Sequence, residues 1–227
     1  MKTNDLICKN LTVTDDNTLA FAGVDCLYLT KKYSTPLYVM DEDKIRENAK
    51  AYINAVKQSF GENAGVLYAS KALSFKRIYE IVNEENLGID VVSQGEIFTA
   101  LKAGFPLEKA YFHSNNKTDE DIAFAIDKGV GYFVVDNEEE LVAISEISLS
   151  KKVVSNVLLR LTPGIDPHTY DEVATGKVDS KFGSAIETGQ ADAITLLALS
   201  LEKVNQQGFY VYLEGIEDPY NFGYALR

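Results

Sequence analysis

Short apolar runs alternate with longer amphipathic stretches from about residue 64 onward, and this alternation limits the possible folds more than any other feature. The apolar runs predict strands at 66–70, 88–92, 110–114, 131–135 and 156–162. The stretches with helical periodicity predict helices at 75–86, 95–103, 118–128 and 137–149. Such alternation predicts parallel strands joined by right-handed helical crossovers, in either an open doubly wound sheet or a closed barrel.

The barrel is favoured because no predicted strand is followed by a Gly-x-Gly-x-x-Gly loop, which is typical of dinucleotide-binding open sheets. An irregular stretch at 163–183 precedes a predicted helix at 189–205 and a last apolar run at 209–213. A complete barrel needs about 250 residues and eight units. The five to six units here therefore predict an α/β fold that is a partial (β/α)8 barrel, left open at one edge, and suggest a fragment.

Ahead of the barrel, residues 19–30 and 36–40 are strand-like, and 41–60 is a predicted helix that Asp41 would cap. We therefore expect an N-terminal strand segment (1–40), an incomplete barrel domain (41–207) and a divergent tail (208–227).

The charge and the cysteines limit the class of protein. Lys and Arg number 22 against 34 Asp and Glu, and the net charge of −12 disfavours nucleic-acid binding. Cys8 and Cys26 are too few for a disulfide framework and lack the spaced partners of a zinc site, so no metal is expected. With no signal-peptide pattern at 1–10 and no apolar run of about 18 residues, we expect a cytoplasmic protein that does not enter membranes.

Lys71 directly follows the run VLYAS, at the carboxyl end of the first barrel strand, where barrel active sites are built. A partly dehydrated lysine amine can attach to an aldehyde cofactor or a carbonyl substrate. The alternative is a surface lysine that opens a loop.

Further polar residues occupy the corresponding ends of other predicted strands: Asp90 with Glu96 six residues later, His113, and Arg160. A buried charge costs several kcal/mol, roughly, unless it is paired, so their coincidence indicates a site. The structural alternatives are a helix-capping Asp, an exposed Glu in a first turn, a hydrogen-bonded His and an Arg–carboxylate pair.

These residues lie in segments that resemble the fold-type III pyridoxal-phosphate decarboxylases, whose barrel is of the alanine racemase type. The segments are YASKAL around Lys71, GIDVVSQGE at 88–96, FHSNNKT at 112–118 and LRLTPGIDPHTYDEVATGKVDSKFG at 159–183. YSTPLYVMDEDKIRENAKAY at 33–52 is similar to the segment that enters the family's barrel. The stretch ending in DSKFG resembles the diaminopimelate decarboxylase branch more than the ornithine and arginine decarboxylases.

The resemblance implies decarboxylation of meso-diaminopimelate to L-lysine, with pyridoxal 5'-phosphate as cofactor and a homodimer as the complete family member. Lys71 would hold the cofactor, and Asp90, His113 and Arg160 would bind or order it. The substrate or the surrounding hydrogen bonds would involve Glu96, His168, Ser180 and Lys181.

The tail departs from the family. Tyr210 and Tyr212 stand where the family has histidines, and no Gly-Ser pair follows, so we expect this chain to be weakly active or inactive alone. Residues 208–227 instead resemble the first motif of SpoU-type RNA methyltransferases, with Asn221 and Arg227 at matching spacing. A gene fusion would explain both likenesses, and a chance match in a turn is the alternative.

Two other functions stay open. The chain could be a non-catalytic remnant or fusion product, whose unpaired barrel edge would invite association. It could also be a pyridoxal-phosphate homeostasis protein with a single barrel, although the strand-like residues 19–40 argue against this. RNA methylation rests on the tail alone and conflicts with the acidic charge.

Overall fold

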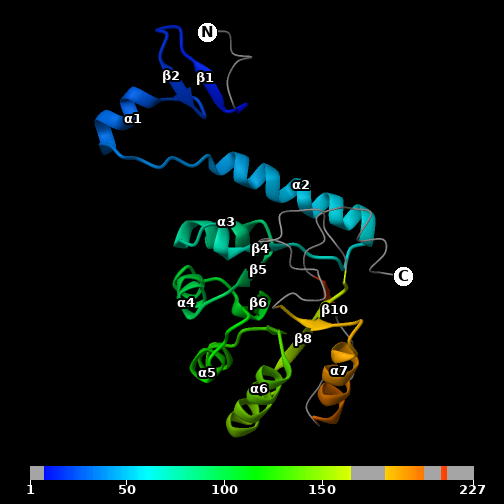
Figure 1. Cartoon of the computed structure of the whole chain (residues 1–227). Helices are drawn as coiled ribbons and strands as arrows, with labels where there is room; N and C mark the ends of the chain where they lie inside the picture. Colours follow the sequence, from blue (N-terminus) through cyan, green and yellow to red (C-terminus); the bar gives the residue numbers. More distant parts are fainter. Residues whose placement is uncertain (1–7, 165–181, 202–210, 214–227) are drawn as a thin grey trace. The chain divides into compact units, whose positions relative to one another are not determined.

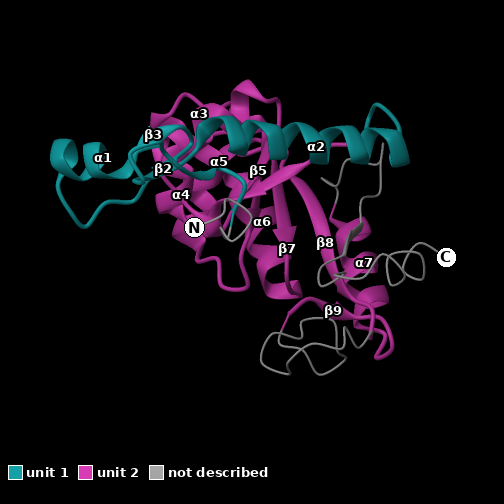
Figure 2. Ribbon diagram, turned by 90° about the horizontal axis from the view of Figure 1, so that it is seen from above, with its two compact units in different colours: residues 1–63 teal, residues 64–227 magenta. Residues whose placement is uncertain are grey.

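The computed structural model describes residues 8–164, 182–201 and 211–213. The chain forms two compact units, Met1–Asn63 and Ala64–Arg227, coloured teal and magenta in Figure 2. Within the described ranges, no helix has the length and apolar character that crossing a membrane requires. The expected domain boundaries at 40/41 and 207/208 remain predictions.

The first unit combines a three-stranded antiparallel sheet with two helices. Its elements are β1 (Leu11–Val13), β2 (Leu19–Phe21), β3 (Val24–Asp25), α1 (Cys26–Tyr33) and α2 (Glu42–Phe60). As predicted, Asp41 caps α2, because its carboxylate accepts a hydrogen bond of 3.1 Å from the backbone N–H of Lys44.

Two predictions for the first unit are wrong. The strand-like stretch expected at 19–30 forms β2 and β3 but gives way to α1 from Cys26, because the Asp25 carboxylate accepts the N–H groups of Leu27 and Tyr28 and so starts a helix. The strand expected at 36–40 does not form, and these residues have no regular secondary structure. Apolar content alone suggested both strands, whereas capping by Asp25 determines where the first of them ends and α1 begins.

The second unit is the predicted partial barrel. Its seven-stranded parallel sheet has the order β10-β8-β7-β6-β5-β4, and β9 also pairs with β8 (Figure 1). The strands are β4 (Leu67–Ala69), β5 (Gly88–Val91), β6 (Ala110–His113), β7 (Tyr132–Val135), β8 (Asn156–Thr162), β9 (Ser184–Ala185) and β10 (Val211–Leu213). The helices are α3 (Lys76–Glu84), α4 (Gln94–Lys102), α5 (Asp119–Asp127), α6 (Glu138–Lys151) and α7 (Gln190–Ser200), with single 3₁₀ turns η2 (Ser70–Ala72) and η3 (Leu107–Lys109).

Helices α3 to α6 lie along one side of the strands (Figure 1), and apolar side chains are buried on this side. On this side Ile89, Val91 and Phe112 are at most 1% exposed. Alternate residues point to opposite faces of a strand, so Asp90 and Tyr111 lie on the other face. That face carries the polar side chains described below.

The loop before β7 packs so closely that only glycine fits at position 131. A Cβ atom there would lie 2.0 Å from the carbonyl oxygen of Glu108. The same loop is fixed by a hydrogen bond of 2.9 Å from the Gly131 N–H to the Leu107 carbonyl.

We therefore expect Gly131→Ala to lower the free energy of unfolding by about 1–3 kcal/mol, because backbone must move to admit the methyl group. Gly95→Ala is the matched control. A Cβ on Gly95, inside α4, would meet only Ser93 Oγ at 3.8 Å. This control should be neutral or stabilising by up to roughly 1 kcal/mol in a denaturant melt. Equal effects of the two changes would contradict the packing described.

Candidate functional site

Parallel pairing places the predicted site residues on one face of the sheet. Asp90 is paired with Tyr111, and His113 lies two residues beyond Tyr111 on the same strand. His113 is paired with Val134, Val134 with Leu158, and Arg160 lies two residues beyond Leu158. Because side chains alternate with a period of two, Asp90, His113 and Arg160 share the face that α3 to α6 leave uncovered.

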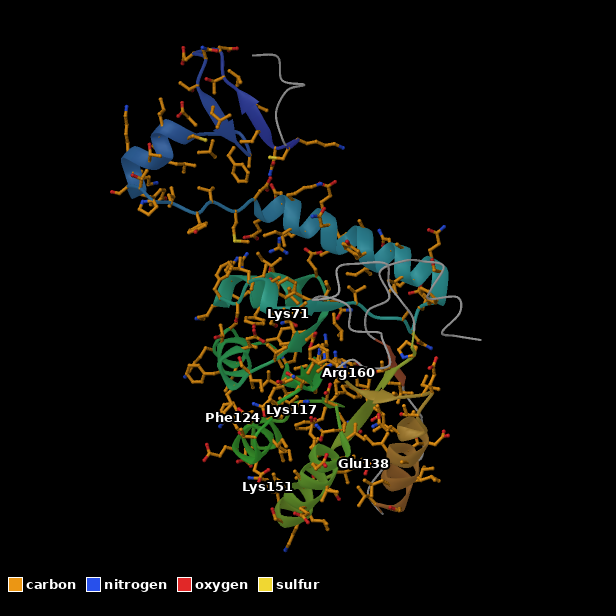
Figure 3. The ribbon with its side chains drawn as sticks, in the orientation of Figure 1. Lys71, Lys117, Phe124, Glu138, Lys151 and Arg160 are labelled. Atoms are coloured by element: carbon orange, nitrogen blue, oxygen red, sulfur yellow. The ribbon has the colours of Figure 1, made fainter. Side chains whose placement is uncertain are left out.

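Lys71 lies at the same end of the sheet, in the 3₁₀ turn η2 that follows β4 (Figure 3). The last residue of β4, Ala69, is paired with Asp90. Lys71 is exposed, and among the described residues none forms a hydrogen bond or an ion pair with its ammonium group. The Lys71 charge nevertheless reaches Glu96, where it acts to lower the pKa of that carboxyl. An accessible amine and a carboxyl group that it influences thus lie near the ends of the first two barrel strands.

Glu96 is held at the start of α4. Its Oε2 accepts a hydrogen bond of 2.7 Å from the backbone N–H of Val92, and Ser93 caps the helix. Burial raises the pKa of Glu96 above its usual value, and the neighbouring charge of Asp90 adds to the rise. Glu96 is therefore a carboxyl group that retains its proton more readily than an exposed glutamate.

Asp90 and His113 are neighbours, with 3.4 Å between Asp90 Oδ2 and His113 Nδ1. Their side chains are only 13% and 7% exposed. The second carboxylate oxygen, Oδ1 of Asp90, is buried and has no hydrogen-bond partner among the described residues. Such an oxygen is costly to leave unsatisfied, so it is suited to accept a hydrogen bond from a bound molecule.

Arg160 is 4% exposed and already has partners. Its guanidinium donates to Asp136 Oδ1, and it lies over the ring of Phe182 with 4.3 Å to the ring centre. The sequence therefore identified a buried arginine but not its carboxylate, which follows β7 directly.

Sequence reasoning also missed a second buried ion pair beside Arg160. The ammonium of Lys117 donates to Glu140 Oε1 at 2.7 Å and to the carbonyls of Ser114 and Val134 at 2.8 and 2.7 Å. Lys117 lies in the FHSNNKT segment directly after β6, which was the one available signal. Glu140 is one of three consecutive glutamates in the first turn of α6, so the sequence does not distinguish it from the other two.

Several predicted residues cannot be placed. His168, Ser180 and Lys181 lie outside the described residues, as does Tyr210. Their roles therefore remain predictions. Within the described ranges, no group of three or more His, Cys, Asp or Glu side chains is arranged to hold a metal ion.

The raised pKa of Glu96 predicts a specific pH dependence. In the unfolded chain this carboxyl ionises around its ordinary value of 4.5, whereas in the folded chain it stays protonated to higher pH. Between these two values the folded state binds more protons, so its contribution to stability falls as the pH rises.

Glu96→Gln removes this ionisation and keeps an acceptor for Val92. We expect the difference in unfolding free energy between Glu96→Gln and wild type to grow in favour of the variant as the pH rises from 4.5 through the folded-state pKa. Chemical unfolding at a series of pH values measures it. A difference that is flat, or that has the opposite slope, would contradict the burial of this carboxyl.

The chain has relatives among known proteins. The chain is 43% identical over 216 residues to the diaminopimelate decarboxylase of Bacillus methanolicus, covering 95% of this chain and 50% of that protein. It is 42% identical over 198 residues to the Bacillus subtilis enzyme, covering 86% and 44%. The chain thus spans about half the length of the curated relatives it matches.

Solved structures give the same result. Diaminopimelate decarboxylase from M. jannaschii, in complex with L-lysine, has a TM-score of 0.77 at 31% identity, over 90% of this chain and 46% of that one. The enzyme from Helicobacter pylori, also complexed with L-lysine, has a TM-score of 0.72 at 28% identity, over 82% and 46%. The fold prediction of a partial barrel is confirmed.

The likeness of residues 208–227 to an RNA methyltransferase receives no support from these comparisons. The family match instead continues to residue 213, and β10 (Val211–Leu213) pairs in parallel with β8 as the next barrel strand. The sequence model that describes the pyridoxal-binding domain of pyridoxal-dependent decarboxylases matches residues 42–213, so the chain belongs to this family.

Proposed function

We propose that the chain is the cofactor-binding part of a diaminopimelate decarboxylase, which converts meso-diaminopimelate to L-lysine and carbon dioxide. The named relatives support this substrate, and the two solved relatives described above contain L-lysine, the expected product. The observation that carries the proposal is the accessible amine of Lys71 beside Glu96 and Asp90 at the carboxyl end of the sheet.

The described residues fit pyridoxal 5'-phosphate. Lys71 provides an amine that could attach to an aldehyde, and the buried Oδ1 of Asp90 needs a hydrogen-bond donor that a bound ring could supply. When bound, the cofactor supplies an electron sink for the bond that breaks as carbon dioxide leaves.

The protein groups then have separate tasks. Lys71 retains the cofactor. Asp90 and His113 hold each other in position and present polar groups to it. Glu96, whose pKa is raised, can keep a proton close to the Lys71 amine and exchange it as the amine changes charge. Arg160, fixed by Asp136, adds a positive group on the same sheet face.

The wider setting follows from the same assignment. We infer a cytoplasmic enzyme that acts on a small amino acid, and a homodimer for the complete protein. Binding of nucleic acid is disfavoured by the net charge of −12.

Titration with pyridoxal 5'-phosphate tests cofactor binding. The wild-type chain should develop an absorption band displaced from that of the free cofactor, and Lys71→Ala should abolish it because the amine is lost. Lys102→Ala is the matched control, since Lys102 is an exposed lysine in the last turn of α4. If Lys71→Ala retains the band, or the control loses it, the assignment of Lys71 fails.

We expect release of carbon dioxide from meso-diaminopimelate by this chain alone to be weak or absent, because about half the length of each relative has no counterpart here. A carbon dioxide assay on the purified, cofactor-loaded chain measures it. Turnover comparable to that of a full-length relative assayed in parallel would contradict this expectation.

A further inference from the structure

Four charged side chains are buried together near the carboxyl ends of β6, β7 and β8. Lys117, Asp136, Glu140 and Arg160 are only 9%, 4%, 7% and 4% exposed. They form two oppositely charged pairs, Lys117–Glu140 and Arg160–Asp136. Lys117 and Arg160 both lie toward the middle of the sheet, whereas Lys151 lies out among the helices (Figure 3).

The two pairs are connected through the backbone that follows β7. Lys117 bonds to the Val134 carbonyl at 2.7 Å, and Glu140 Oε2 lies 3.5 Å from the backbone nitrogen of Asp136. The Lys117–Glu140 pair therefore contacts the backbone at two points, the Val134 carbonyl and the Asp136 nitrogen. Asn137 helps to fix the position of Glu140, because its side chain accepts the backbone N–H of Glu140 at 2.9 Å and caps α6.

The guanidinium of Arg160 is thus held on two sides. Asp136 accepts from its Nη1, and the Phe182 ring lies 4.3 Å from its central carbon. Asp136 can hold Arg160 in one orientation only if the backbone at and just before Asp136 is fixed. The polar contacts to this backbone include Lys117 on the Val134 carbonyl and Glu140 facing the Asp136 nitrogen.

We propose that the Lys117–Glu140 pair is a positioning element, which fixes Asp136 and through it the orientation of Arg160 in the cofactor site. Only the statement that Arg160 lies in a cofactor site rests on the proposed function. Neither Lys117 nor Glu140 needs to touch the cofactor.

Stability alone is a weak explanation for this pair. Replacing a buried ion pair by apolar residues of similar volume is often neutral or stabilising, whereas removing one partner leaves a buried charge uncompensated. Burial lowers the pKa of Lys117 and raises that of Glu140, as expected for charges removed from water. A double apolar variant can therefore separate positioning from stability.

The experiment compares Lys117→Met/Glu140→Leu with wild type, after denaturant melts establish that the double variant is folded. Asp127→Asn is the matched control, because it breaks the surface pair of Lys151 and Asp127, which is 2.6 Å long. Should the double variant be unfolded, Asn137→Ala, which frees the Glu140 N–H, serves as the milder second variant.

The first readout needs no cofactor. The chain has four arginines, Arg46, Arg77, Arg160 and Arg227, so their side-chain Nε–Hε signals can be resolved by NMR and assigned with Arg160→Lys. We expect a displaced, slowly exchanging Arg160 signal in wild type and in Asp127→Asn, and its collapse toward the signals of exposed arginines in the double variant. An unchanged Arg160 signal in the folded variant overturns the inference.

The second readout is the dissociation constant of pyridoxal 5'-phosphate. Removing residues that orient a binding group typically weakens binding about tenfold or more, so we expect such a loss in the double variant and none in Asp127→Asn. If the Arg160 signal collapses but affinity is unchanged, positioning does not extend to the cofactor and the inference fails. If wild type binds no cofactor at all, the proposed function fails, and the Arg160 signal alone still decides whether the pair positions Arg160.

Discussion

The in-register pairing of parallel strands is the constraint on which the site depends. Asp90, His113 and Arg160 are far apart in sequence, and each sits on a different strand. They share one face because β5 to β8 pair in register and side chains alternate with a period of two. A slip of one residue in any of these strands would turn its polar side chain into the helix-covered core.

The two faces of the sheet differ in how they are stabilised. The helix-covered face buries aliphatic and aromatic side chains, and removing their apolar surface from water stabilises the fold. The other face buries charges, and each of the charges at β6, β7 and β8 has a partner of opposite sign. Asp90 Oδ1 is one of two buried side-chain atoms among the described residues that have no hydrogen-bond partner, and such an atom needs an explanation, for example a molecule that binds there.

Sequence periodicity was sufficient for the barrel and for the strand ends, because both depend on local patterns. It failed at 26–30, where a side-chain cap from Asp25 starts helix α1 in a stretch expected to be a strand. It also missed the partners of buried charges. Lys117 and Glu140 are 23 residues apart, and Asp136 and Arg160 are 24 apart, so only the folded sheet brings them together. The position of Arg160 in a predicted strand identified this arginine but could not supply its carboxylate.

The central claim is that Lys71, among eighteen lysines, holds the cofactor. Borohydride reduction of the cofactor-loaded chain, followed by proteolysis and peptide mass spectrometry, tests this most directly, because reduction fixes the pyridoxyl group on the lysine that carries it. We predict that the modification maps to the peptide containing Lys71 at near-complete occupancy. A modification spread over exposed lysines, or located mainly on another lysine, would contradict the account.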